Sequence, residues 1–349
     1  MSLPVSAPSA APSPSAAPSP SAVPAPAPSA GSVPGAAGVR GLRVTRALAA
    51  GFEGRSEASL HPDLRAFVGD LVRPYGLPLR EDLLREGAGH DYGEMAAGLL
   101  GKVLAEDEPA DLLILAFSSH DVRPAAPSAL YLSRHCPGQP MAFAICDQGS
   151  AAAFTALRIA AAHHRTGGCR RAVVVLAEQS VLHYEAPESV ALPAQHRAVV
   201  LVCEEGEGEG LRVRQEEQSD GSLALASVLA AHRELGTGAG LLLAADLGRT
   251  GGPEDVGTLL GAGTALGAGT TVDAGTALGT GTTVDAEAAD GAGATDAVGT
   301  TAPPGQPFTG VWSLLAEHLA RHPETGGGGP LLVADHDRRL GRLSILTLA

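Results

Sequence analysis

A strand, a helix and a second strand follow one another in the middle of the chain, and this order constrains the fold more than any other feature. Residues 142–146 form a short apolar run that leads into an alanine-rich helix over about 150–162. Basic residues and a glycine pair over 163–168 suit the end of that helix. Residues 172–177 are again apolar and short. The segment therefore predicts a βαβ unit, in which a helix connects two parallel strands.

The same alternation continues along the rest of the chain. An uninterrupted apolar run such as residues 111–117 is typical of a strand that is covered on both faces. We therefore expect an α/β fold with a mixed, largely buried sheet and helices on both faces. Further strands are predicted at 39–48, 197–203, 240–244, 331–334 and 343–348, and further helices at 92–106 and 312–321.

Two low-complexity tracts divide the chain. Residues 1–38 are rich in Pro, Ala and Ser and predict a disordered tail. The tract at about 250–304 contains a near-perfect duplication, and because two copies are too few for a solenoid, we interpret it as an expanded surface loop. The folded part is then expected as an N-terminal half at 39–205 and a reduced C-terminal half at 206–349.

Composition excludes several functions. A formal net charge of -14 with a single lysine, Lys102, leaves no basic stripe for nucleic acid. The four cysteines show no paired spacing, so we expect reduced thiols. The sequence contains neither a secretory signal nor an apolar run of membrane-spanning length. We expect a cytoplasmic protein with no cofactor and no membrane partner.

A candidate nucleophile lies at the start of the central helix. The strand at 142–146 turns through Gln148-Gly149 into Ser150, which small residues follow. Free backbone N–H groups and the helix dipole stabilise negative charge that develops at such a position. Serine is also a very common N-cap residue, so Ser150 has a purely structural interpretation as well.

This turn resembles the nucleophile turn of ketosynthase III and chalcone synthase enzymes in the thiolase superfamily. Ser150 stands where that family has its cysteine, and residues 111–121 resemble the family's D-L-L-I-V-A-T-S-T-P-D strand. The likeness covers about 39–248 and 305–349. It implies a thiolase-like layered α-β-α-β-α fold with mixed sheets and a truncated second half.

The resemblance fails at the positions that the family uses for condensation. Asp246 lies near the place of the family's histidine, and Phe308 lies near the place of its asparagine. The G-D-G-A turn corresponds to residues 192–196, and the glycine-rich turn that helps to form an oxyanion hole corresponds to 335–339. The chain is therefore expected to lack most of the family's condensing machinery.

Other residues of catalytic type show no informative spacing. His120, His196, His232 and His336 are interpreted as exposed or structural residues. The segment from Asp335 to Asp337 has the residue types of a metal site, but alternate side chains in a tight turn diverge. We therefore predict no metal ion.

Three functions follow from these observations. The first is a non-condensing subunit that pairs with an active ketosynthase in fatty-acid- or polyketide-type secondary metabolism. The second is an acyltransferase that uses Ser150 to move an acyl group from acyl carrier protein or acyl-CoA to an acceptor. The third is a diverged binding module, since fold alone does not establish function. The resemblance also implies a homo- or heterodimer with a ketosynthase-like subunit.

Overall fold

Two five-stranded sheets form the frame of the protein. The computed structural model describes residues 40–123, 127–187, 190–250, 299–322 and 329–349, and all structural statements concern these residues. The predicted tail at 1–38 and most of the predicted loop at 250–304 lie outside them. The described residues belong to the compact unit Gly38–Ala349.

The first sheet is mixed. Its spatial order is β1-β5-β4-β2-β3, in which β1 and β4 are antiparallel to β5, and β2 is parallel to both β4 and β3. Valine and alanine dominate its buried central strands, as expected for strands that are covered on both faces. The strands are β1 (Arg40–Phe52), β2 (Leu112–Phe117), β3 (Met141–Ile145), β4 (Arg171–Glu178) and β5 (His196–Glu207).

The second sheet repeats this topology. Its order is β6-β10-β9-β7-β8, with β6 and β9 antiparallel to β10, and β7 parallel to both β9 and β8. Numbered from the start of each half, both sheets read 1-5-4-2-3, so the two halves of the fold have the same pattern. The strands are β6 (Arg212–Glu217), β7 (Gly240–Leu243), β8 (Gly299–Thr301), β9 (Leu331–Asp337) and β10 (Arg342–Leu348).

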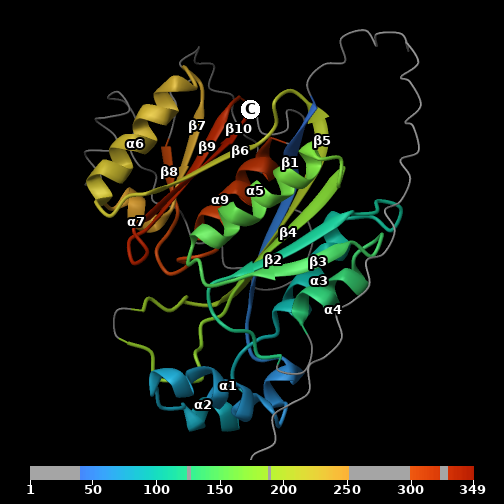
Figure 1. The fold of residues 1–349 in the computed structure, drawn as a ribbon, viewed down its shortest axis with the longest axis vertical. Coiled ribbons are helices and arrows are strands. Elements are labelled where there is room, and N and C mark those ends of the chain that lie inside the picture. The colour runs from blue at the N-terminus through green and yellow to red at the C-terminus, as the bar shows by residue number, and fades with distance from the viewer. Residues whose placement is uncertain (1–39, 124–126, 188–189, 251–298, 323–328) are drawn as a thin grey trace, which may run out of the picture. The chain divides into compact units, whose positions relative to one another are not determined.

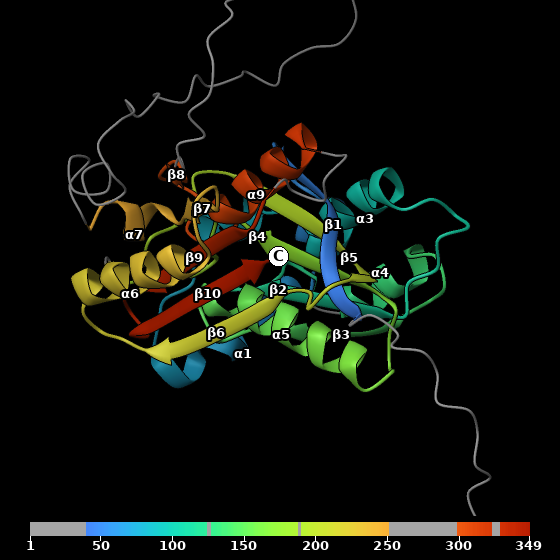
Figure 2. The ribbon, with the colours of Figure 1, turned by 90° about the horizontal axis from the view of Figure 1, so that it is seen from above.

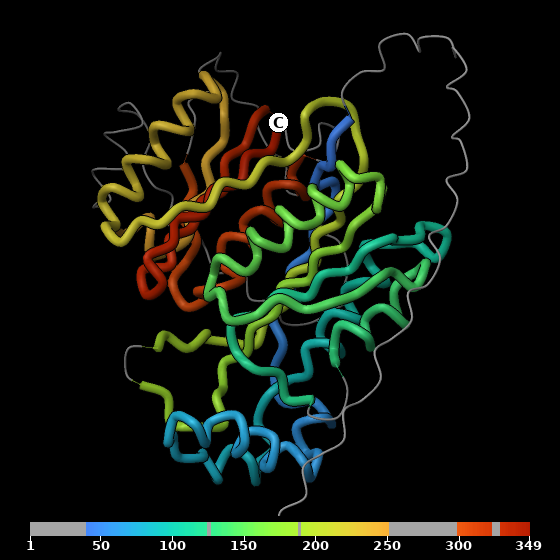
Figure 3. Tube along the Cα trace, viewed as in Figure 1, coloured from blue at the N-terminus to red at the C-terminus, as the bar shows by residue number. Residues whose placement is uncertain are grey.

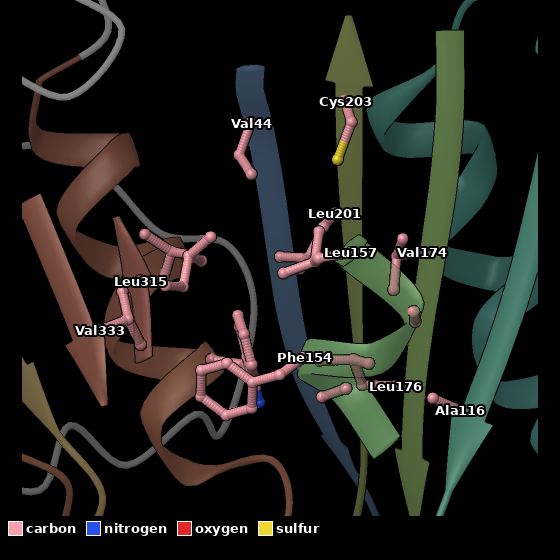
Figure 4. Close-up of a cluster of buried hydrophobic side chains, with 14 of the residues drawn as sticks. Val44, Ala116, Phe154, Leu157, Val174, Leu176, Leu201, Cys203, Leu315 and Val333 are labelled. Atoms are coloured by element: carbon pink, nitrogen blue, oxygen red, sulfur yellow. The ribbon is translucent and has the colours of Figure 1, made fainter. Parts of the chain in front are cut away.

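Helices separate and cover the sheets in five layers (Figure 1). The central helices α5 (Ala151–Arg165) and α9 (Gly310–Arg321) lie between the sheets, where the rings of Phe154 and Trp312 are 4.8 Å apart. Figure 4 shows Phe154 and Leu157 of α5 in the apolar cluster that joins both sheets. The layered α-β-α-β-α fold is therefore confirmed.

The outer layers each cover one sheet, as the view from above also shows (Figure 2). Helices α3 (Tyr92–Val103) and α4 (Ser128–His135) pack on the first sheet. Helices α6 (Gly221–Glu234) and α7 (Ala245–Gly248) pack on the second. No helix in the described ranges combines the length and apolar character that a membrane span requires.

A short helical insertion connects β1 to α3 and lies away from both sheets (Figure 3). Its small apolar cluster also includes Val122 and Tyr184 from the rest of the fold. The Arg80 N–H donates to the backbone carbonyl of His183 at 2.8 Å, which attaches the insertion further. Its elements are η1 (Glu57–Leu60), α1 (Leu64–Val72), η2 (Arg73–Tyr75) and α2 (Glu81–Glu86).

The turn from β3 into α5 is formed by two residues in the left-handed region. Asp147 has φ 61° and Gly149 has φ 51°, a conformation that glycine adopts readily and other residues rarely do. At its other end α5 continues to Arg165, and the Gly168 N–H donates to the His163 carbonyl at 2.8 Å. The glycine pair thus ends the helix as the sequence predicts, and Ser150 lies where the backbone bends.

Candidate functional site

Ser150 occupies the N-cap position of α5, but its hydroxyl does not cap the helix. The residue is half-buried with φ -68°, and its side chain makes no capping hydrogen bond. A capping serine would accept a bond from an N–H of the first turn. Ser150 therefore lies at the N-cap position that the structural interpretation expects, but the side-chain capping bond that this interpretation implies is absent.

The backbone N–H of Ser150 is already bound to a carboxylate from the other half of the fold. Asp337, the last residue of β9, accepts this bond through Oδ2 at 3.0 Å. A Cβ atom on Gly149 would lie only 1.8 Å from the same oxygen. Asp337 therefore rests directly on the turn that precedes α5, and only glycine fits beneath it.

A second carboxylate of β9 lies beside the Ser150 side chain. Asp335 is buried, and burial raises its pKa to about 7, while a hydrogen bond with the Ser150 side chain opposes that rise. The nearby charges of Asp337 and Asp246 raise the pKa further. Its Oδ2 atom is buried with no hydrogen-bond partner among the described residues. Asp335 is therefore the acidic side chain that could act as a general base for the Ser150 hydroxyl.

The placement of these two acids corrects one prediction. The sequence suggested a tight turn over 335–339, but β9 runs to Asp337 before the chain turns. Residues two apart in a strand point to the same face, so Asp335 and Asp337 converge on Ser150 instead of diverging. Within the described ranges, no three His, Cys, Asp or Glu side chains are arranged to hold a metal ion.

A polar network connects the first turn of α5 to strand β6 of the second sheet. Gln215 of β6 donates from Nε2 to the Ala151 carbonyl at 3.1 Å and to the Thr155 hydroxyl at 3.2 Å. The Thr155 hydroxyl in turn donates to Gln148 Oε1 at 2.7 Å. The turn before α5 is therefore held by the second sheet as well as by β3.

The N-terminus of α9, the other central helix, is closed by a buried carboxylate. Glu178, at the end of β4, accepts bonds from the Phe308 N–H at 3.0 Å, the Thr309 N–H at 3.1 Å and the Thr309 hydroxyl. Burial raises the pKa of Glu178 to about 7, although these bonds oppose the rise. Phe308 itself is only 1% exposed. The position expected near the family's asparagine thus holds an apolar side chain inside the core.

The four histidines singled out from the sequence have structural surroundings. His232 Nε2 bonds the Ala239 carbonyl at 2.8 Å, and His336 Nε2 bonds the Gln218 carbonyl at 2.6 Å. His120 contacts His183, and burial lowers its pKa to about 3. Burial likewise lowers the pKa of His196 to about 4. None of these histidines is hydrogen-bonded to Ser150 in the described part of the chain.

Cys146 is the exposed thiol near the turn, four positions before Ser150. Its Sγ lies 3.3 Å from Asp147 Oδ2. Burial and then the neighbouring Asp147 raise the pKa of the thiol. Because the thiolate is the nucleophilic form of cysteine, this environment does not supply a substitute nucleophile. The other three cysteines are buried and free.

Solved structures of similar fold are ketosynthase III-like enzymes. The chain superposes on 3-oxoacyl-(acyl carrier protein) synthase III, FabH, from Pseudomonas aeruginosa PAO1 with a TM-score of 0.51 and 13% identity, over 88% of this chain and 98% of that one. AbyA1, a tetronic acid condensing enzyme, gives a TM-score of 0.52 at 15% identity, over 88% and 99%. ChlB3, an acyltransferase, gives 0.51 at 15%, over 88% and 98%.

Sequence comparison alone finds no relative: no protein-family model and no curated protein matches the chain. At 13–15% identity the structural likeness concerns the fold. The chain has the thiolase-like fold that these enzymes share, as the resemblance of the turn at Ser150 implied. What the site does must be argued from its own residues.

Proposed function

We propose that this protein is a non-condensing, ketosynthase III-like subunit that pairs with an active ketosynthase in fatty-acid- or polyketide-type secondary metabolism. The observation that carries the proposal is the negative charge around Ser150. Asp337 binds its amide, Asp335 lies beside its hydroxyl, and Asp246 is close enough to raise the pKa of Asp335. Condensation develops an oxyanion and then an enolate, and both require hydrogen-bond donors or positive charge.

The second helix end supports the same proposal. An enolate in a condensing site needs a polar donor near the start of α9, and this chain has the buried Phe308 there. The backbone N–H groups of Phe308 and Thr309 are bound to Glu178 and are not free for a ligand. Neither central helix therefore offers an unoccupied N-terminus to a developing anion.

An edge strand offers a surface for a ketosynthase-like partner. Strand β3 lies at one edge of the first sheet and contains only apolar residues, of which Met141 is 53% exposed. Leu130 on the adjoining helix α4 is 49% exposed. An unpaired apolar edge is a template for pairing with a strand of another chain. We propose that a second ketosynthase-like subunit, in a homo- or heterodimer, covers this edge in the cytoplasm.

The pairing is tested with a defined partner. The chain is co-expressed with each cysteine-bearing ketosynthase III of its source organism in turn, and complex formation is measured by size-exclusion chromatography with light scattering. Met141→Asp should abolish the complex because it buries a charge in the interface. Leu223→Asp is the matched control, since Leu223 is 59% exposed on α6 at the far sheet. Equal complex formation by both variants would contradict the proposed surface.

A second function is favoured by the contact between Ser150 and Asp335. In this alternative, the Ser150 hydroxyl attacks the carbonyl of an acyl thioester from acyl carrier protein or acyl-CoA. Its proton passes to Asp335, whose pKa near 7 suits a general base, and then to the departing thiolate. The acyl group would afterwards move to an alcohol, amine or thiol.

Intact mass spectrometry separates the two functions. After incubation with acyl-CoA or acyl carrier protein loaded with the same acyl group, the non-condensing subunit should carry no added mass. An adduct that disappears in Ser150→Ala but persists in Cys146→Ser would instead establish the acyltransferase.

A further inference from the structure

The helical insertion between β1 and α3 meets the rest of the fold at a small contact, which we call the insertion interface. Backbone bonds cross it in both directions: the Arg80 N–H donates to the His183 carbonyl at 2.8 Å, and the Glu185 N–H donates to the Pro78 carbonyl at 2.9 Å. On the side of the main fold, the interface is formed by the segments that follow β2 and β4, at residues 118–123 and 179–185. A local change in these segments can therefore release the insertion while both sheets stay folded.

Two histidines in the insertion interface are hydrogen-bonded ring to ring. His183 is buried, and its Nε2 lies 2.7 Å from the carbonyl oxygen of Ala88 in the insertion. A carbonyl oxygen only accepts, so Nε2 carries the hydrogen and Nδ1 has the lone pair. This Nδ1 lies 3.3 Å from His120 Nε2, which therefore donates to it. Both rings are neutral in this arrangement, and the contact fixes the tautomer of each.

A proton added to His120 would have no hydrogen-bond acceptor. Because Nε2 of this ring is the donor, its Nδ1 is the atom that accepts the proton, and Nδ1 is buried with no partner in the described part of the chain. The neighbouring Gln179 Oε1 is also unpartnered there, so it is not hydrogen-bonded to that nitrogen. The closed interface would then contain a buried, uncompensated cation, which is costly.

A proton added to His183 would break the pair as well. Its Nδ1 would become a donor and face the donating Nε2 of His120, 3.3 Å away. In agreement with this geometry, burial lowers the pKa of His183, and burial followed by the nearness of His183 lowers the pKa of His120 to about 3. The closed interface thus disfavours a proton on either ring.

The charged groups around the pair do not offset such a cation. Asp121 follows His120 in the sequence, but burial and the nearby Asp91 raise the pKa of Asp121 to about 7, so it is neutral in acid. From the β9–β10 hairpin, the cation Arg339 acts on Tyr184, whose ring centroid is 5.6 Å from that of His120. On the insertion side, the charges are Arg80 and the acids that act on it, Asp82, Glu86 and Glu185. Among the described residues, the histidines in ion-pair contact with an acid are His61 and His164.

We propose that His120 and His183 form an acid-sensitive contact that releases the helical insertion from the segments after β2 and β4. At neutral pH the uncharged pair joins the two sides of the insertion interface. Opening brings both rings into water, where histidine titrates near 6.5. The open state then binds more protons than the closed state, so the closed state loses stability as the pH falls below about 6.5. This inference does not rest on the proposed function.

The test measures amide hydrogen exchange of the full chain by NMR between pH 7.5 and 5. The reporters are the amides of Arg80 and Glu185, which cross the insertion interface. Rates are converted to protection factors, because the intrinsic exchange rate itself changes with pH. Below about pH 6.5 each histidine should lower these protection factors by up to about tenfold per pH unit, or about a hundredfold for the pair. Amides of the central strands β4 and β5 should keep their protection.

A variant with one titrating ring removed sharpens the test. His120→Phe keeps an aromatic ring beside Tyr184 and should reduce the fall to about tenfold per pH unit at most. His232→Gln is the matched control, because His232 is a buried histidine whose Nε2 bonds the Ala239 carbonyl at 2.8 Å on the second sheet. That control should keep the full pH dependence at the insertion interface.

Protection at Arg80 and Glu185 that is constant over this pH range would overturn the inference, and so would a loss of protection that is equal in β4 and β5. A His120→Phe variant with the pH dependence of the unmodified chain would also contradict it. Should thermal melting show that this variant is unfolded, His120→Gln takes its place with the same expected and contradicting results. Neither condensation nor partner binding is measured, so the outcome is independent of the test of the proposed function.

Discussion

The two central helices begin in the same topological place and are closed in the same way, yet their N-termini differ in what surrounds them. Each receives a carboxylate from the opposite half: Glu178 of β4 binds the start of α9, and Asp337 of β9 binds the start of α5. At α9 the carboxylate is fully buried and its three donors are all satisfied. At α5 the Asp337 carboxylate contacts a half-buried turn that contains Ser150. Asp335 lies beside that turn and has one oxygen without a hydrogen-bond partner in the described part of the chain.

The difference indicates that the N-terminus of α9 has a purely structural role, whereas the N-terminus of α5 does not. A buried acid with satisfied partners holds two halves of a core together. A half-buried turn whose hydroxyl contacts a buried acid with one unpaired oxygen has retained the features of a site. Four measurements test whether the two helix ends differ in this way.

The largest effect is expected at α9. Glu178→Ala leaves two buried N–H groups without an acceptor, and the Thr309 hydroxyl keeps only its longer bond to Gln306 Oε1 at 3.4 Å. The free energy of unfolding should therefore fall by about 3 kcal/mol or more. Glu178→Gln is the control, because it keeps an acceptor and should cost much less. Urea denaturation gives both values. Equal losses would show that one retained acceptor does not stabilise this helix end and that both carboxylate oxygens are needed.

Gly149→Ala should lower the free energy of unfolding by about 2 kcal/mol, because the new Cβ meets Asp337 and φ is positive. Adding Asp337→Ala to this variant should recover part of the loss, since the contact is removed. Gly98→Ala in α3, where a Cβ has open space, should not destabilise the protein. An additive double mutant would argue against direct contact between Gly149 and Asp337.

Stability should fall as pH rises through about 7. Asp335, Glu178 and Asp121 all have folded-state pKa values near 7, above their ordinary values, because burial disfavours their charged forms. A raised carboxyl pKa contributes stability that is fully present below the unfolded-state value near 4. That stability is lost as the pH rises through 7.

Each of these groups contributes a slope of up to about 1.4 kcal/mol per pH unit. Urea denaturation at pH 5.5, 7 and 8.5 measures the total slope. Asp335→Asn and Glu178→Gln should each reduce it. The buried His120 and His196, whose pKa values are lowered, contribute a slope of opposite sign below about pH 6.5, so the change caused by each substitution is the decisive value. An unchanged slope in both variants would mean that these acids are less buried than the structure indicates.

The smallest effect on stability is expected for Asp337→Asn. Loss of a charge at a partly exposed helix N-terminus costs about 1 kcal/mol or less, and the hairpin stays anchored through His336. A loss as large as that of Glu178→Ala, measured under the same conditions, would remove the distinction between the two helix ends.

Local patterns predicted the central part of the fold. The βαβ unit, the turn at Gln148-Gly149 and the start of α5 at Ser150 are encoded by residues close in sequence, through small side chains and a glycine stop. Strand β6 was not predicted, since its residues are polar and it lies at a sheet edge. The β-strand propensity of its residues gives little indication of such an edge strand.

The acids around Ser150 could not be found from the sequence because they come from a distant strand. Asp337 lies 187 positions after Ser150, and only the packing of the second sheet against α5 brings them together. The apolar run at 331–334 gave one signal, because a strand that continues for three residues would place Asp335 and Asp337 on one face. Glu178 was missed for a related reason: a charge that ends an apolar strand is usually exposed.

The proposed absence of condensing activity is tested by an assay of condensation itself. The purified chain is incubated with an acyl thioester and a malonyl thioester, and product and carbon dioxide release are followed by mass spectrometry and by a coupled assay, with FabH as the positive control. The carboxylates around Ser150 predict neither a condensed product nor decarboxylation above the buffer rate. A β-ketoacyl product that disappears in Ser150→Ala would contradict the account.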